Sequence, residues 1–298
     1  ESFERGTYDG RYYGGLMYCG AHTKRFSGSG GNLNLQNLPR GEMFGVDLRS
    51  QIEAAPGNTL VVVDLSQIEV RTLCWLAEDQ ETLEEIRKSD DIYEAFAVRF
   101  GLWDPANGSL RENDKQLRQT VKGMVLGCGY GASAKKYAMI MKCSLEDAER
   151  SVALYQKKMS KVIKLWKKYN RQLKLTADSE EYRIELPSGN AIVYRNVARG
   201  TDSLTCTLVR NGKPMVIRPW YGMITENCSQ SLARDIFCQQ LTNIENAGHK
   251  IILHVHDEVI IECAETEAQR TLDEVVKIMS TPPSVSYTHL RAHETKAN

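Results

Sequence analysis

Two acidic residues stand where predicted strands end. Asp64 closes the apolar run TLVVVDLS (59–66), and Asp257 lies in the turn of IILHVHDEVIIE (251–262). A carboxylate at a strand end commonly holds a hard cation, because the strand fixes the backbone while the oxygens project into a cleft. If the strands are sheet neighbours, Asp64 and Asp257 could hold two Mg²⁺ ions about 3.5 to 4 Å apart, as in phosphoryl transfer. Spacing alone equally allows each acid to cap a helix or a turn.

A pair of cations could bind the phosphates of such a reaction. RQTVKGMVLGCGYG (118–131) places Arg118, Lys122 and Leu126 four residues apart, so we expect them on one broad helix face. Lys offers phosphate a point charge and Arg a fork of donors. An isolated Arg–Lys pair with this spacing usually lies on a solvent-exposed helix face. Its combination with two strand-end carboxylates favours a triphosphate site.

A second basic stretch and the remaining reactive side chains have simpler interpretations. YQKKMSKVIKLWKKYNRQLK (155–174) carries eight Lys or Arg and could follow a nucleic-acid backbone, although a solvated face over a buried stripe is more usual. We expect His254 to be a core or interface histidine. The eight cysteines are scattered without a CxxC pair, so we interpret them as packing residues in a reducing cytoplasm.

The amino-acid composition is compatible with several classes of protein. The chain has 298 residues, 42% hydrophobic, and 38 basic against 38 acidic residues, which neither indicates nor excludes a nucleic-acid partner. No apolar run approaches the roughly 20 residues that span a bilayer, so no membrane partner is expected.

Both ends of the chain look unnatural. Glu1 is not an initiator Met, and the chain opens in mid-pattern, so we expect a cut N-terminus. VSYTHLRAHET (285–295) resembles the translated read-through of a transposase-type sequencing adapter. We therefore interpret 285–298 as an artefact tail and leave it out of the fold prediction.

The elements that must position these residues follow from hydrophobic periodicity. Residues 1–59 are rich in Gly, Ser and Asn and predict loops and short turns, followed by the strand 59–66. Helices are predicted from 68 onward, including 113–126, 132–141 and 144–175. Two hairpins are predicted around 187–190 and 211–214. A long helix at about 223–247, the strand pair around Asp257 and a last helix near 265–280 complete an α+β fold, a sheet domain with a mostly helical insertion.

Four segments together resemble one family. VVVDLSQIEVR, RQTVKGMVLGCGYG and HVHDEV are similar to the first palm motif, the fingers helix and the last palm motif of family A DNA polymerases. HTKRFSGSGGNLNLQNLPR (22–40) is similar to the upstream segment that contacts primer and template. The order is right, which makes the match specific. It covers about residues 12–283, and the SGSGG insertion suggests the phage-type branch.

The resemblance implies a role for each matched residue. Asp64 and Asp257 match the aspartates that bind two Mg²⁺, Glu258 and His256 match neighbours near the primer end, and Glu69 matches the gate against a ribose 2′-hydroxyl. The other matches form two groups. Those at the incoming nucleotide are Arg118, Lys122, Leu126, Tyr130 and Gln67. Those at the DNA are Arg25, Asn34, Gln36, Asn37 and Gln230.

Two positions depart from the family pattern. Leu126 stands where the family usually has Phe or Tyr against the sugar, and Tyr93 where we expect His. Leu offers no flat face, which places sugar discrimination in doubt. Leu126 as simple helix packing fits the sequence equally well.

We therefore predict a right-hand palm with a fingers insertion. The expected parts are palm at 1–77, fingers at 78–222 and palm again at 223–284, with the thumb and any exonuclease domain upstream of Glu1. The expected partners of this monomer are primer–template DNA and deoxynucleoside triphosphates. Two alternatives remain open: a single-subunit RNA polymerase, which Glu69 argues against, and a catalytically silent nucleic-acid-binding remnant, which does not need Asp64 and Asp257.

Overall fold

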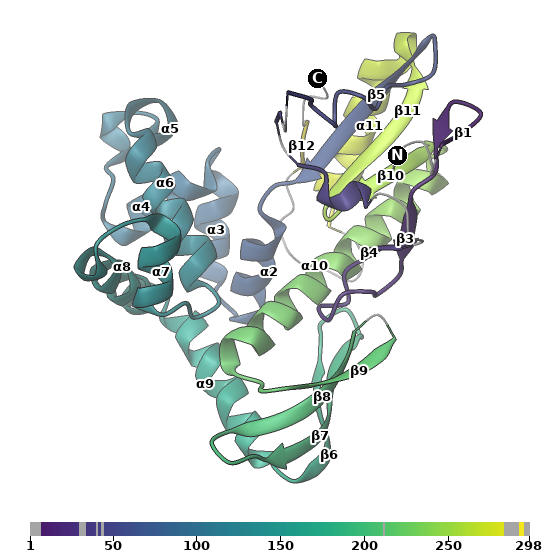
Figure 1. Ribbon diagram of the computed structural model, residues 1–298. Helices are drawn as coiled ribbons and strands as arrows, with labels where there is room; N and C mark the ends of the chain where they lie inside the picture. Colours follow the sequence, from purple (N-terminus) through teal and green to yellow (C-terminus); the bar gives the residue numbers. More distant parts are fainter. Residues whose placement is uncertain are drawn as a thin grey trace.

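The computed structural model describes residues 7–29, 34–39, 41–42, 45–210, 212–282 and 292–294. Figure 1 shows a helical body on one side, a sheet with helices at the upper right, and a second sheet below them. The long helix α10 (Tyr221–Asn246) runs between the two sheets and contacts both. The mixed α+β fold predicted from the sequence is confirmed.

The upper sheet carries the candidate catalytic strands. Its order is β10-β11-β5-β12, with antiparallel neighbours throughout: β10 Ile251–Val255, β11 Glu258–Ala264, β5 Asn58–Leu65 and β12 Ala292–Glu294. Val61, Val63 and Leu65 of β5 are buried because the face of the strand that carries them packs against α11 (Ala268–Ser280) and α10. This core places the C-terminal ends of β5 and β10 on a rigid support.

The helical body follows β5 directly. Its helices are α2 Ile68–Leu76, α3 Gln80–Lys88, α4 Ile92–Phe100, α5 Leu110–Asn113, α6 Lys115–Gly123, α7 Ala134–Met141, α8 Leu145–Lys158 and α9 Ser160–Leu175. Five of them start at a side-chain cap that the sequence supplies, Asp79, Asp91, Asp114, Ser133 or Ser144. A capping oxygen satisfies a backbone N–H that has no partner within the helix, so these residues fix where each helix begins.

The lower sheet packs on α9 and the N-terminal half of α10. Its order is β6 Ser179–Glu185, β7 Ala191–Arg199, β8 Leu204–Arg210 and β9 Lys213–Ile217. The N-terminal segment crosses α10 as four strands of two or three residues, β1 Thr7–Tyr8, β2 Arg11–Tyr12, β3 Gly15–Met17 and β4 Ser27–Ser29, followed by the 3₁₀ turn η1 Leu35–Asn37.

Three details differ from the sequence prediction. The helix expected over 144–175 is interrupted at Met159, where α8 ends and α9 begins. The helix expected over 113–126 ends at Gly123 and continues as a π turn, η3 Met124–Cys128. The hairpin expected around 211–214 is tighter, because Lys213 and Pro214 already belong to β9; Asn211 lies outside the described residues.

The domain boundaries remain a prediction, as does the artefact tail, of which only 292–294 is described. No described helix is long and apolar enough to span a bilayer.

Candidate active site

The two strand-end carboxylates lie on neighbouring strands. β5 and β11 pair so that Asp64 stands opposite Glu258, and the backbone N–H of Leu65 donates to the carbonyl of Asp257 at 3.1 Å. The turn from β10 to β11 is sharp, with His256 at φ +57°, a left-handed conformation rarely adopted by residues other than glycine. The neighbouring strands on which the two-metal hypothesis depends are therefore present.

A tight turn joins Asp64 to the next helix. Gln67 precedes α2 in the left-handed conformation, at φ +44°, and the Nε of buried Arg71 donates to the carbonyl of Ser66 at 3.0 Å. The strand therefore changes to helix within two residues. This geometry places Glu69, in the first turn of α2, close to the carboxyl end of β5.

Glu69 is the centre of the site. Its Oε1 lies 2.7 Å from Nη1 of Arg25, its Oε2 accepts a hydrogen bond from the Tyr130 hydroxyl at 3.1 Å, and the side-chain amide of Gln230 approaches both oxygens at 3.4 Å. These partners come from the N-terminal segment, the residues after η3, and α10. The fold thus brings together four residues that are as much as 205 positions apart in the chain.

Two glycines allow Tyr130 to reach Glu69. Gly131 has φ +73°, and a Cβ there would meet the Tyr221 ring at 2.7 Å. Gly222, at the start of α10, lies so close to the Tyr130 carbonyl that a Cβ would approach it to 2.2 Å. Larger residues would push η3 away from α10. Burial, and next the Glu69 carboxylate, raise the pKa of Tyr130, so its hydroxyl stays protonated and can donate.

The carboxylates around this centre repel one another. Burial is the main cause that raises the pKa of Asp257 to about 6, and Glu69 and Glu258 raise it further while Arg25 lowers it. Burial and Glu69 likewise raise the pKa of Glu226 on α10. An excess of negative charge in a partly buried position favours a cation.

The donor set fits Mg²⁺ held jointly with a substrate. No group of three or more His, Cys, Asp or Glu side chains among the described residues could form a metal cage. Mg²⁺ is usually bound by one or two carboxylates together with water and substrate phosphates, and not by an all-protein cage. Asp64 and Asp257 would supply the two carboxylates of such a site.

Arg118 and Lys122 both lie on α6, one turn apart, as predicted, and their role in binding phosphate remains a prediction. Arg118 is paired with a carboxylate: its Nε donates to Oδ2 of Asp91 at 2.5 Å and its Nη2 to Oδ1 at 3.2 Å. Lys122, one turn on, has no partner among the described side chains. Leu126 lies in the π turn that follows α6, and its side chain is 42% exposed.

The upstream segment has mixed roles. Asn34 caps η1, because its Oδ1 accepts a hydrogen bond from the Gln36 N–H at 3.1 Å, and Gln36 is buried. Asn37 is exposed at the end of η1. The ammonium of Lys24 donates to the Ala191 carbonyl and so ties this segment to β7. Of the proposed DNA-contact residues in this segment, only Arg25 reaches the Glu69 centre directly.

His254 is a core residue, as predicted. It lies between the rings of Phe26 and Phe237, at centroid distances of 4.5 and 5.7 Å. Burial lowers its pKa to about 4, so it is neutral at physiological pH. The eight cysteines are all free thiols, four of them buried.

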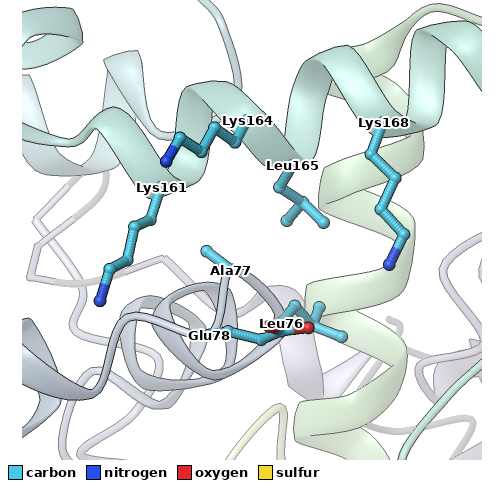
Figure 2. A pocket seen from close by; sticks show the side chains of 7 residues that line it. All are labelled: Leu76, Ala77, Glu78, Lys161, Lys164, Leu165 and Lys168. Atoms are coloured by element: carbon cyan, nitrogen blue, oxygen red, sulfur yellow. The ribbon is translucent and has the colours of Figure 1, made fainter.

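The basic stretch 155–174 is a solvated face over a buried stripe. Figure 2 shows Lys161, Lys164 and Lys168 of α9 around a cavity of about 290 Å³ whose other wall is Leu76, Ala77 and Glu78. Lys161 is 3.5 Å from the buried carboxylate of Asp79. Trp166 and Tyr169, the aromatic residues that could stack on bases, are buried in the core. The stretch therefore lacks the exposed rings of a single-strand binding surface.

Sequence reasoning missed two parts of this site. Asp91 holds Arg118, and its only sequence signal is its position as a helix cap before IYEAF. Ser229 contacts the Tyr130 hydroxyl at 3.3 Å and lies against Thr72 of α2 at 2.8 Å. A buried serine on a long helix gives no such signal, because its partners are decided by tertiary packing.

Comparisons with known proteins agree with this geometry. The model of DNA polymerase family A matches residues 5–189. The DNA polymerase of Bacillus phage SP02 is 26% identical over 93% of this chain and 50% of its own length. The thermostable DNA polymerase I of Thermus filiformis is 26% identical over 91% of this chain and 30% of its own length.

A solved structure shares the fold. It is the POL domain of Pol1 from M. smegmatis in complex with DNA primer-template and dNTP, with a TM-score of 0.73 at 23% identity over 98% of this chain and 49% of that chain. The chain spans about half the length of these relatives, or less. Because the family model matches more than half of its residues, the chain belongs to DNA polymerase family A.

Proposed function

We propose that this chain forms the palm and fingers of a template-directed DNA polymerase. The reaction joins the primer 3′-hydroxyl oxygen to the α-phosphorus of a deoxynucleoside triphosphate and breaks the bond to the β-phosphate, releasing pyrophosphate. The observation that carries the proposal is the meeting of Arg25, Tyr130 and Gln230 at Glu69, beside the paired ends of β5 and β11. A family A fold without this function would not need to gather these polar groups in one place.

The carboxylates have a defined task in this reaction. We propose that Asp64 and Asp257 hold two Mg²⁺, which stabilise the charge on the attacking and leaving oxygens. With a pKa of about 6, Asp257 is mostly ionised at neutral pH and can act as a ligand. Glu258 and His256 flank it in the turn and support its position. The protein then contributes by positioning and electrostatics, with little covalent chemistry.

The nucleotide and the DNA would be held by residues from separate elements. Arg118 and Lys122 on α6 bind the triphosphate, with Leu126 and Gln67 near the sugar and Tyr130 beside the template base. Arg25 and Gln230 contact the primer-terminal pair, and Asn34, Gln36 and Asn37 support or contact the backbone. Such contacts follow duplex shape and phosphate without reading sequence. The protein would act as a monomer in the cytoplasm of a bacterial or phage-infected cell.

Primer extension tests this proposal. The natural reading frame that contains these residues, and separately the 298-residue chain, are given primed template, Mg²⁺ and either deoxy- or ribonucleotides. We expect deoxynucleotide extension that Asp64→Asn and Asp257→Asn each abolish. A preference for ribonucleotides would favour the RNA polymerase alternative. A folded protein that binds DNA equally with and without Mg²⁺ but extends nothing would favour the silent remnant.

A further inference from the structure

Arg118 lies in a cradle formed by the start of α4. Asp91 precedes this helix, and its Oδ1 accepts a hydrogen bond from the Tyr93 N–H at 3.1 Å, which fixes the carboxylate. The same carboxylate receives Nε and Nη2 of Arg118, at 2.5 and 3.2 Å. The Tyr93 ring lies under the guanidinium, with Cζ 5.0 Å from its centroid. Arg118 is therefore held both along one edge and on one face.

This contact differs from an ordinary surface ion pair. The Asp91 side chain is 9% exposed and that of Arg118 is 24% exposed, so water competes weakly for either group. A second arginine, Arg111, also approaches Asp91, at 3.6 Å, but its side chain is 64% exposed and is expected to contribute little. The principal partner of the Asp91 carboxylate is the α6 arginine, 27 residues away in the chain.

The geometry leaves the other edge of the guanidinium for a ligand. Asp91 uses Nε and one N–H of Nη2, and the described residues offer Arg118 no further hydrogen-bond acceptor. Five N–H donors in a rigid fork can serve two partners on opposite edges. Because Asp91 compensates the charge of Arg118, the net positive charge of this face of α6 lies on Lys122. Arg118 then orients a bound phosphate group, and the charge of Lys122 attracts it.

We propose that Asp91 is a positioning residue that holds Arg118 in the orientation in which it binds the nucleotide triphosphate. This inference rests on the proposed function, since it concerns the same phosphate site. Holding the side chain before the substrate arrives lowers the entropy cost of binding. In the opposite role, the Asp91 carboxylate would compete with the triphosphate for Arg118. Removing the charge of Asp91 would then tighten nucleotide binding. The direction of the change in nucleotide affinity therefore separates the two roles.

The test is the variant Asp91→Asn, because Asn caps a helix as well as Asp does but cannot give Arg118 a charged, two-oxygen partner. We expect the KM for the incoming deoxynucleotide to rise about tenfold, with kcat within about twofold. The thermal midpoint of unfolding should stay unchanged. In an Arg118→Ala background the same substitution should have almost no further effect on KM.

The matched control is Asp114→Asn. Asp114 caps α6, the helix that carries Arg118, through the Leu117 N–H at 2.8 Å, and it does not contact the guanidinium. The Asp114→Asn substitution removes the same charge from a helix cap, so we expect the KM of this variant for the incoming deoxynucleotide to match that of the unmodified protein. If Asp91→Asn does not fold, Asp91→Ser keeps the cap and is assessed in the same way.

Three results would overturn the proposal: a KM for Asp91→Asn that is unchanged or lower, an equal rise in Asp114→Asn, or a full effect that persists without Arg118. Equilibrium binding of the Mg²⁺ complex of dATP, followed by intrinsic fluorescence, is measured in parallel. If the unmodified protein binds this nucleotide but extends no primer, the proposed function fails while the cradle can still be assessed. If it binds no nucleotide, both fail.

Discussion

The substitution Asp257→Asn should stabilise the protein while it removes activity. In the absence of metal, the Asp257 carboxylate is partly buried beside Glu69 and Glu258, and its pKa rises from the ordinary 3.8 to about 6. Each pKa unit corresponds to ~1.4 kcal/mol. Ionised Asp257 therefore lowers the free energy of unfolding by up to ~3 kcal/mol, and an uncharged amide of the same size should recover most of it.

The sign of the effect sets its pH dependence. The folded protein binds this proton more tightly than the unfolded chain, so the ionised carboxylate costs nothing below about pH 3.8. The cost grows between 3.8 and about 6, and is complete above about 6. The variant should therefore gain most over the unmodified protein at pH 7 to 8 and lose that gain as the pH falls through this window.

Urea denaturation at a series of pH values, with a metal chelator present, measures this difference. Added Mg²⁺ should reduce it, because the ion binds only the ionised carboxylate and stabilises the folded unmodified protein by mass action. A matched control is Glu267→Gln, which removes an exposed carboxylate in the 3₁₀ turn before α11. A variant that is no more stable than the unmodified protein at pH 8 would show that burial does not raise the pKa of Asp257.

Three further substitutions test the surroundings of the site. Leu126→Phe should place a flat ring in the π turn and lower the KM for deoxynucleotides about two- to fivefold or change dideoxynucleotide selectivity; unchanged single-turnover kinetics would remove the idea that Leu126 faces the sugar. Glu69→Ala should reduce the ratio of kcat/KM for deoxy- over ribonucleotides about tenfold or more, measured on one template, because it removes the carboxylate that Arg25 and Tyr130 contact and that is proposed to exclude the ribose 2′-hydroxyl. Phe237→Ala should lower the free energy of unfolding by about 3 to 5 kcal/mol in denaturant titration, because this ring of α10 is fully buried in the core against the upper sheet; a loss below about 1 kcal/mol would contradict that packing.

Local patterns in the sequence account for much of the framework. The apolar run before Asp64, the strand pair around Asp257 and the helical periodicities are short-range signals, and the structure contains these elements close to their predicted bounds. Strand-end acids can be recognised because a strand fixes the direction of the next side chain. The break at Met159 and the π turn at Met124–Cys128 were not predicted, because both depend on packing against other elements and not on local propensity.

Tertiary structure alone decides which polar groups contact one another. The sequence marked Glu69, Arg25, Tyr130 and Gln230 individually, but their convergence depends on how α2, α10 and the N-terminal segment pack. The pairing of Arg118 with a helix cap 27 residues earlier had no pattern in the sequence to reveal it. Charge and hydrogen-bonding capacity belong to the residue type and can be read in the chain. Burial, partner and pKa belong to the environment, which exists only once the chain has folded.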